Sequence, residues 1–250
     1  MSASAHVASS RINRREDDRL LTGRGRYADD IAHQGALYAA FVRSPYPCAS
    51  ILSIDPADAL ACPGVVAVFT HRDLAASGFV DMPVPFRLPQ GDGSFATETP
   101  RPFLAADRVL FVGEPVAMVL ADTPAAALDG VERVQVSYEE LPAVVVVDEA
   151  LAPQAPQLWP DRPGNVGFDW HKGDQARVQA AFEASFKVVS LRSHISRAAA
   201  MPMEPRAALG RIDEDGRPVL TVAHQSPHQL RAELALRMGM SPKDLRVVVG

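Results

Sequence analysis

The side chains best placed to do chemistry lie in a short polar stretch near the end of the chain. A run rich in β-branched residues, 219–223, leads into His224 and Gln225. Ser226-Pro227 then supplies a favoured N-cap and first helical position. The carboxyl end of a strand is where α/β units usually bind ligands. We therefore predict a binding site at this junction, with Gln225 as its candidate residue. An ordinary structural amide is the alternative, because glutamine has no intrinsic catalytic signature.

Two further pairs of residues could bind a ligand or a metal. His224 and His228 are four residues apart, but Pro227 lies between them and the sequence has no HExxH motif. We favour solvent-facing or supporting roles for both histidines over a metal pair. Glu204 and Arg206 flank a proline at the start of an expected strand. A structural ion pair is the favoured interpretation there, and a contact with a ligand is the alternative.

Other chemical signatures are weak. Residues 23–28, GRGRYA, match the dinucleotide fingerprint GxGxxA, but no apolar strand precedes them, so we favour a turn-rich entry segment. Cys48 and Cys62 are too few and too far apart for an iron–sulfur cluster on this chain. We expect both to be small buried side chains. The sequence contains no GxSxG elbow, Walker loop or Cys–His catalytic signature.

The composition is that of an ordinary globular chain. The 250 residues are 47% hydrophobic and 22% charged, which is enough to bury a core. The net charge of −5 gives no reason to expect nucleic acid or an anionic membrane as partner. No run approaches the roughly 18 apolar residues of a membrane span. The N-terminus has no apolar segment of a secretory signal, so cytoplasm is the expected compartment.

Apolar patterning predicts an α/β (α+β) fold in the first part of the chain. We expect two strands around a tight turn at Gly113, and a long loop over residues 79–102 that lacks catalytic signatures. Strands alternate with two short helices, which predicts a mixed sheet over residues 20–147. The expected strands are 36–42, 50–54, 65–69, 109–112, 116–120, 134–138 and 144–147, and the expected helices are 55–60 and 122–131.

The second part begins after an extended, proline-rich linker, residues 148–170. Asp174 is expected to cap a helix, and residues 188–191 are expected to form a strand. A hairpin around residues 213–216, a helix ended by Gly239 and a strand from residue 245 follow. The expected organisation is a disordered lead-in (1–19), a first domain (20–147), the linker (148–170) and an incomplete α/β domain (171–250).

From about Arg14 onward the chain contains many short segments in an order typical of one protein family. They include RREDDRLLTGRGRYADD, AAFVRSPYPCASILSID, PGVVAVFT, VLFVGEPVAMVLAD, VQVSYEELPAV, PGNVGFDW, PMEPRAALGRID and HQSPHQLRAELALRMGMSPKDLRVVVG. With these segments the chain resembles the molybdenum-cofactor-binding large subunits of the xanthine dehydrogenase, aldehyde oxidase and carbon monoxide dehydrogenase family. The resemblance implies an a/b hammerhead domain at residues 20–147. It also implies the N-terminal part of a molybdopterin-binding domain at residues 171–250.

This resemblance gives Gln225 a role. In the family, the glutamine at that position hydrogen-bonds an oxygen-type ligand of the molybdenum, which suits an uncharged amide beside an anionic cofactor. The implied cofactor is molybdopterin with molybdenum, in its plain or cytosine dinucleotide form. The implied partners are the remainder of the large subunit, an FAD-binding medium subunit and a 2Fe-2S small subunit. The implied reaction inserts water-derived oxygen into a small-molecule substrate.

Some residues of the family pattern are not found. No catalytic residue and no direct metal ligand is expected in this chain, since the family's glutamate base and glycine-rich DVGGGFG segment would lie beyond Gly250. At residues 195–197 only Arg197 fits the Asn-Gln-Arg often seen there, which leaves the substrate class open. The main hypothesis is the N-terminal piece of a molybdenum hydroxylase large subunit that is inactive alone. The alternative is a non-catalytic hammerhead module used for assembly or partner binding.

Overall fold

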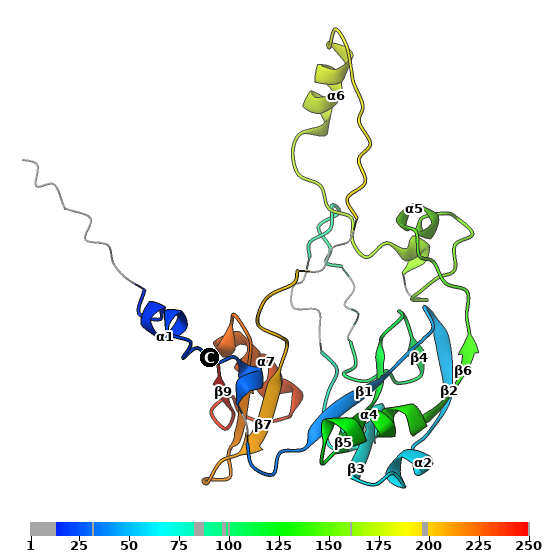
Figure 1. Cartoon of the computed structure of the whole chain (residues 1–250). Helices are drawn as coiled ribbons and strands as arrows, with labels where there is room; N and C mark the ends of the chain where they lie inside the picture. The colour runs from blue at the N-terminus through cyan, green and yellow to red at the C-terminus, as the bar shows by residue number, and fades with distance from the viewer. Residues whose placement is uncertain are drawn as a thin grey trace, which may run out of the picture. The chain divides into compact units, whose positions relative to one another are not determined.

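A computed structural model describes residues 14–31, 33–82, 88–96, 99, 101–160, 162–196 and 200–249. The chain divides into two compact units. The larger unit comprises Gln34–Ala199 with Leu236–Met240. The smaller unit comprises Met1–His33, Ala200–Ala235 and Ser241–Gly250. Strands and short helices alternate along the chain, which confirms the predicted α/β class (Figure 1). No helix among the described residues is long and apolar enough to cross a membrane.

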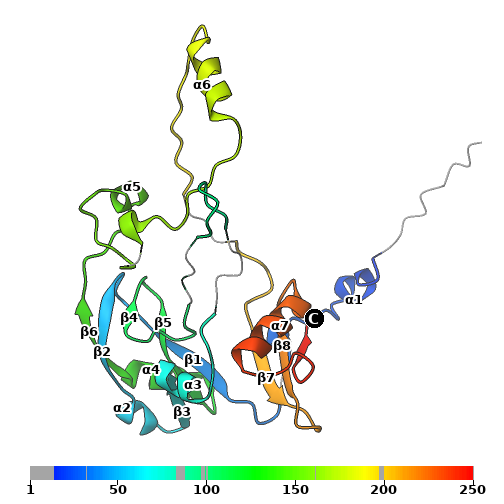
Figure 2. The ribbon, with the colours of Figure 1, turned by 180° about the vertical axis from the view of Figure 1, so that it is seen from behind.

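The first sheet of the larger unit has β5 (Pro115–Ala121) at its centre. It pairs antiparallel with β1 (Tyr38–Arg43) on one side and β3 (Val65–Thr70) on the other. Helix α4 (Pro124–Arg133) packs against this sheet and begins where the Thr123 hydroxyl accepts a hydrogen bond from the Ala126 backbone N–H at 3.1 Å (Figure 2). The predicted cap and helix at this point are therefore confirmed.

A second sheet completes the core of the larger unit. Strand β2 (Ala49–Asp55) lies between β4 (Arg108–Val109) and β6 (Gln135–Glu140), again antiparallel. Ile54 and Val136 pack against both buried clusters, so the two sheets share one continuous apolar interior. The short helical segments around these sheets are α2 (Ala57–Leu60), α3 (His71–Ala76), α5 (Val147–Ala150) and η2 (Pro163–Asn165).

Two strand predictions between residues 109 and 147 are wrong, those at 109–112 and 144–147, whereas the predicted strand at 116–120 is confirmed as β5. The expected strand pair around Gly113 does not form, because β4 ends at Val109 and pairs with β2, while β5 pairs with β1 and β3. The carboxylate of Glu114 accepts a hydrogen bond from the Leu110 backbone N–H, which turns the chain before it can pair. The expected strand at 144–147 is irregular and then enters α5.

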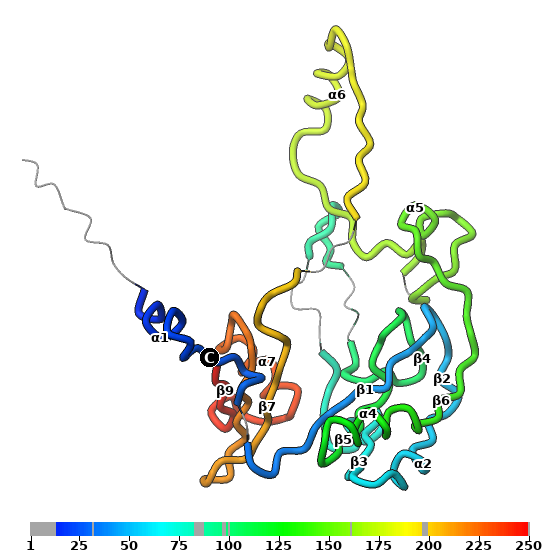
Figure 3. The backbone as a smooth tube through the Cα atoms, viewed as in Figure 1, coloured from blue at the N-terminus to red at the C-terminus, as the bar shows by residue number. Residues whose placement is uncertain are grey.

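The segment from 166 to 196 extends away from both sheets, and we call it the arm (Figure 3). Its helix α6 (Gln175–Glu183) begins where an oxygen of the Asp174 carboxylate accepts from the Arg177 backbone N–H at 3.0 Å, as predicted. The predicted strand at 188–191 is wrong for the described structure, since the segment is extended there but pairs with no described strand. A strand needs a neighbour for its backbone groups, and no other described segment hydrogen-bonds to the backbone of these residues.

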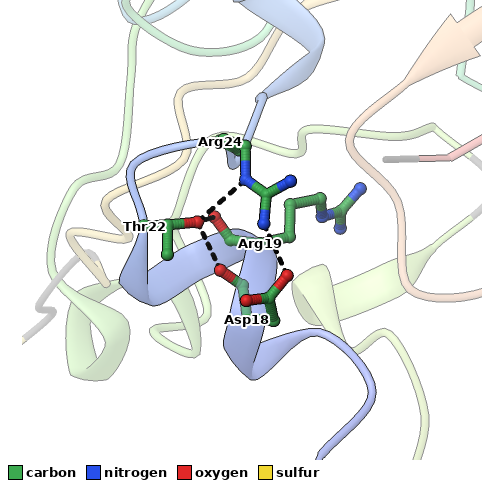
Figure 4. A network of polar contacts seen from close by, with 4 residues as sticks. All are labelled: Asp18, Arg19, Thr22 and Arg24. Atoms are coloured by element: carbon green, nitrogen blue, oxygen red, sulfur yellow. Dashed lines mark hydrogen bonds and ion pairs between the residues drawn. The ribbon is translucent and has the colours of Figure 1, made fainter.

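Within the smaller unit, the first described residues form helix α1 (Asp17–Leu21) and the 3-10 turn η1 (Ala28–Asp30). A polar network closes the end of α1: the guanidinium of Arg24 forms an ion pair with Asp18 and donates to the Thr22 hydroxyl at 2.9 Å (Figure 4). The Thr22 hydroxyl donates in turn to backbone carbonyls of the helix. The predicted turn-rich entry segment thus contains one short, polar helix.

The smaller unit is built on one sheet of three strands in the order β7-β8-β9. Strand β7 (Ala208–Ile212) pairs antiparallel with β8 (Pro218–Val222), and β9 (Arg246–Val248) pairs parallel with β8. Helix α7 (Pro227–Arg237) connects β8 to β9. Gly239 adopts a φ of 65° directly after this helix, which confirms it as the residue that ends it. The predicted hairpin, helix and last strand are all present.

Candidate functional site

The structure places Gln225 between the end of β8 and the start of α7. Val222 is the last residue of β8 and Pro227 is the first residue of α7, so the predicted junction is present. The Gln225 side chain is exposed, and no described residue forms a hydrogen bond with its amide. The oxygen and the nitrogen of this amide are therefore both available to a ligand. Beyond Pro227, which has no N–H, the backbone N–H groups of the first turn of α7 follow, and such groups favour an anion.

The Asp213 turn fixes strand β8 in front of this junction. The Asp213 carboxylate accepts hydrogen bonds from the backbone N–H of Arg217 at 2.8 Å and of Asp215 at 3.1 Å. It also forms an ion pair with the Arg217 guanidinium at 3.2 Å. The backbone N–H of Arg217, followed by its guanidinium, holds the pKa of Asp213 below its ordinary value. The Asp213 carboxylate therefore stays ionised at neutral pH and keeps the turn closed, which maintains the register of β7 and β8.

The two histidines of the junction, His224 and His228, lie near Gln225 in the chain. The Nδ1 atom of His224 accepts a hydrogen bond from the Ser226 backbone N–H at 3.0 Å, so this ring is turned toward the backbone at the helix start. His228 is exposed on the first turn of α7. Across the part of the chain that the structure describes, no three His, Cys, Asp or Glu side chains gather as metal ligands. A supporting role for His224 agrees with this geometry.

The remaining candidates lie apart from Gln225. Glu204 and Arg206 precede β7, and within the described ranges they form no ion pair with each other, so the expected structural pair is not seen. Arg197 and Gly250 lie outside the described residues. Cys48 and Cys62 are buried free thiols of the larger unit, as predicted.

One feature of the larger unit was not predicted from the sequence. A cavity of about 190 Å³ lies where the residues after β6 fold back over the second sheet. Its wall includes Cys48, Val144, Leu158 and Trp159. The lining is mostly apolar and carries no pair of groups arranged for acid–base chemistry. No local sequence signal could have revealed it, because its wall comes from segments about a hundred residues apart.

The fold and the junction define an α/β chain whose second part presents an uncharged amide at a helix start. Two family models match it: "Aldehyde oxidase and xanthine dehydrogenase, a/b hammerhead domain" over residues 22–142, and "Molybdopterin cofactor-binding domain" over residues 158–250. The chain belongs to the xanthine dehydrogenase family of molybdenum-cofactor-binding large subunits.

Known relatives agree with this membership. The chain is 36% identical to the nicotine 6-hydroxylase large subunit of Paenarthrobacter nicotinovorans, over 97% of this chain and 29% of that protein. It is 32% identical to the carbon monoxide dehydrogenase large chain of Hydrogenophaga pseudoflava, over 94% of this chain and 29% of that protein. Among solved structures, quinoline 2-oxidoreductase from Pseudomonas putida 86 superposes with a TM-score of 0.84 at 36% identity, covering 95% of this chain and 29% of that one. The chain thus spans less than a third of the length of these relatives.

Proposed function

We propose that the chain is part of the large subunit of a molybdenum hydroxylase and that Gln225 contributes to its cofactor site. The observation that carries the proposal is the unpaired, exposed amide of Gln225 within the region matched by the molybdopterin cofactor-binding domain. An amide donor fits an anionic pterin cofactor, because it gives a hydrogen bond without adding negative charge. Bound there, the cofactor supplies two-electron oxidation with water-derived oxygen.

This chain's own residues have a supporting part in that reaction. The amide of Gln225 would orient an oxygen-type ligand of the molybdenum, and the N-terminus of α7 would favour the cofactor's negative charge. The Asp213 turn and the bond from Ser226 to His224 hold the junction in position. The glutamate base of the family pattern is not among these residues. We therefore propose that the 250 residues alone do not catalyse the reaction.

The proposed cofactor and partners follow the family. The pterin is proposed in its plain or cytosine dinucleotide form, with electrons leaving through a 2Fe-2S subunit and an FAD-binding subunit in the cytoplasm. The proposed domain division is a hammerhead domain at 20–147, a linker at 148–170 and a molybdopterin-binding part from 171. The match to a cofactor-binding domain favours this function over a non-catalytic hammerhead module.

The names of two relatives indicate which substrates to assay first. The nicotine 6-hydroxylase subunit and quinoline 2-oxidoreductase are each 36% identical to this chain. Nicotine and quinoline are both nitrogen heteroaromatic compounds. We therefore propose compounds of this class as first substrates, in assays that follow the transfer of ¹⁸O from labelled water into the product. Product labelled from dissolved oxygen instead of water would contradict a molybdenum hydroxylase.

Gln225 is tested in the natively purified protein with the polypeptides that accompany it. We expect molybdenum and pterin in that preparation, and we expect Gln225→Ala to lower molybdenum occupancy or turnover by roughly 10- to 100-fold. The matched control is Gln229→Ala on the following helix α7, because the amide of Gln229 already donates to Glu233 at 2.7 Å. Wild-type protein without molybdenum and without larger partner chains would contradict the proposed function. Equal losses in the two variants would contradict the role of Gln225.

A further inference from the structure

The arm, residues 166–196, carries an apolar surface that nothing in the described structure covers. Every residue of the arm from 166 to 196 is exposed. Its large apolar side chains include Val178, Phe182, Phe186, Val189, Leu191 and Ile195. An exposed apolar surface of this extent is typical of a site of interaction with another polypeptide.

The helix of the arm has no packing of its own. Helix α6 is nine residues long and has no buried residue. Val178 and Phe182, four residues apart on one face, are each 54% exposed, and Phe186 beyond the helix end is fully exposed. A helix this short is only marginally stable in water without a packed face. The Asp174 cap starts the helix, but a partner surface is needed to hold it.

The chain after the helix has the pattern of a strand without a sheet. Side chains along 187–196 alternate, with Val189, Leu191 and Ile195 on one face. The opposite face is polar apart from Val188, and its Arg192 forms an ion pair with Asp148 of α5. No described backbone group pairs with 187–196, so its N–H and C=O groups are open to a neighbouring strand. Extended segments of this kind bind by adding a strand to a sheet edge.

We propose that the arm docks onto the polypeptide that corresponds to the remainder of the relatives' large subunits. Residues 187–196 add a strand to the edge of a sheet in that polypeptide, and the Val178–Phe182 face of α6 is buried against it. Two observations favour this occupant. The chain covers only 29% of the length of its relatives, and the arm lies inside the region matched by the molybdopterin cofactor-binding domain. The inference rests on the proposed function, since the occupant belongs to the same large subunit.

The test combines the full 250-residue chain with a defined second polypeptide. The probe is the part of the Paenarthrobacter nicotinovorans nicotine 6-hydroxylase large subunit outside the region matched by this chain. The two are co-expressed, their complex is isolated by gel filtration, and amide hydrogen exchange is measured by mass spectrometry. We expect the amides of 187–196 to exchange at least about tenfold more slowly in the complex than in the chain alone.

Two variants that introduce the same charge on opposite faces of the proposed strand test which face contacts the second polypeptide. Leu191→Asp places a carboxylate on the apolar face and is expected to raise the Kd of the complex more than about tenfold, because a buried unpaired charge opposes docking. Ser190→Asp makes the same charge change on the polar face and is expected to change the Kd less than about threefold. Both residues are exposed in the isolated chain, so neither variant is expected to disturb its folding.

Each other outcome is decisive. The proposal is overturned if the polypeptides fail to associate, if both variants weaken the complex equally, or if 187–196 still exchanges freely in the complex. Protection of the same amides in the chain alone, with a mass that rises with concentration, would assign the surface to a second copy and overturn the proposal. Molybdenum in a complex whose arm is unprotected would refute the docking and leave the proposed function standing. A protected arm in a complex without molybdenum would support the docking and count against the cofactor.

Discussion

Gly130 of α4 lies so close to Val119 of β5 that a Cβ atom added at Gly130 would be 2.8 Å from the Cγ1 atom of Val119. It would also lie 2.9 Å from Cγ2 of Val65 in β3. Real Cβ atoms essentially never approach so closely. Gly130 therefore sets the distance between the helix and the sheet, although a glycine inside a helix costs about 1 kcal/mol relative to alanine.

The substitution Gly130→Ala is expected to destabilise the larger unit despite its better helix propensity. Overpacking against the two valines costs about 1–3 kcal/mol, which exceeds the propensity gain of about 1 kcal/mol. We expect a net loss of about 1 kcal/mol in the free energy of unfolding by urea titration. The control is Asp129→Ala, next to it on the exposed face of α4. Greater stability of Gly130→Ala would show that the helix can move away from the sheet.

Asp73 gives a pH-dependent prediction at the start of α3. Its carboxylate accepts from the Thr70 hydroxyl at 2.7 Å and from the Thr70 backbone N–H at 2.7 Å. The Thr70 hydroxyl, followed by the Thr70 backbone N–H, holds the pKa of Asp73 below its ordinary value. A lowered folded-state pKa means that the carboxylate stabilises the fold above its unfolded pKa, and that this contribution disappears as pH falls through the folded pKa.

The variant Asp73→Ala is therefore expected to lose about 1 kcal/mol or less at neutral pH, the usual scale for a helix cap. The difference from the wild type should stay constant at pH values above the unfolded pKa of an aspartate, about 3.9, and shrink as pH falls below it through the lowered pKa of folded Asp73. Urea unfolding of both proteins across this pH range measures it. A difference that does not depend on pH would mean that the charge of Asp73 has no part in the stabilisation.

Local signals predicted the elements around Gln225 because each signal acts on residues only a few positions away from itself. The turn at Asp213, the Ser226-Pro227 helix start and the glycine at 239 act over one or two turns of chain. Where the sequence prediction failed, strand pairing depends on segments that are distant in the sequence. Residues 188–191 have strand character, but a strand requires a neighbour, and no described strand pairs with them.

The strand pair predicted around Gly113 also fails because the actual pairing partners are distant in the sequence. Strand β5 pairs with β1 and β3, which are distant in the sequence, and the Glu114 carboxylate turns residues 110–114 away from pairing. The Gln225 role itself comes from family resemblance, since no physical property of a glutamine distinguishes a ligand contact from a structural amide. Residue chemistry indicated the junction as a candidate site, and the resemblance supplied the proposed cofactor.

The turn before Gln225 can be tested at Gly216, which adopts a φ of 78°. This left-handed conformation costs a residue with a Cβ about 1–2 kcal/mol. Gly216→Ala is expected to destabilise the smaller unit by about 1 kcal/mol and to speed amide exchange in β7 and β8. Glu214→Ala is the control, because Glu214 is an exposed residue of the same turn. Equal exchange in the two variants would show that the turn tolerates the added Cβ.

Asn165 holds the chain between β6 and the arm through three side-chain hydrogen bonds. Its amide oxygen accepts from the Leu158 backbone N–H at 2.8 Å, and its amide nitrogen donates to the Ala150 carbonyl at 3.1 Å and the Pro156 carbonyl at 2.9 Å. Asn165 also adopts a φ of 56°, which asparagine tolerates better than most residues. The Asn165 side chain thereby connects the backbone at Ala150, Pro156 and Leu158.

Replacement of Asn165 by alanine is expected to loosen this segment by about 2 kcal/mol, since each bond contributes about 0.5–1.5 kcal/mol and the new residue is strained at positive φ. Limited proteolysis should cut residues 150–165 faster in the variant, while amide exchange in the two sheets stays unchanged. Gln157→Ala is the matched control, because the Gln157 amide makes one bond, to the Ala155 carbonyl at 3.2 Å. If both variants are cut at the wild-type rate, the segment is held by the apolar contacts of Leu158 and Trp159 around the cavity instead of by Asn165.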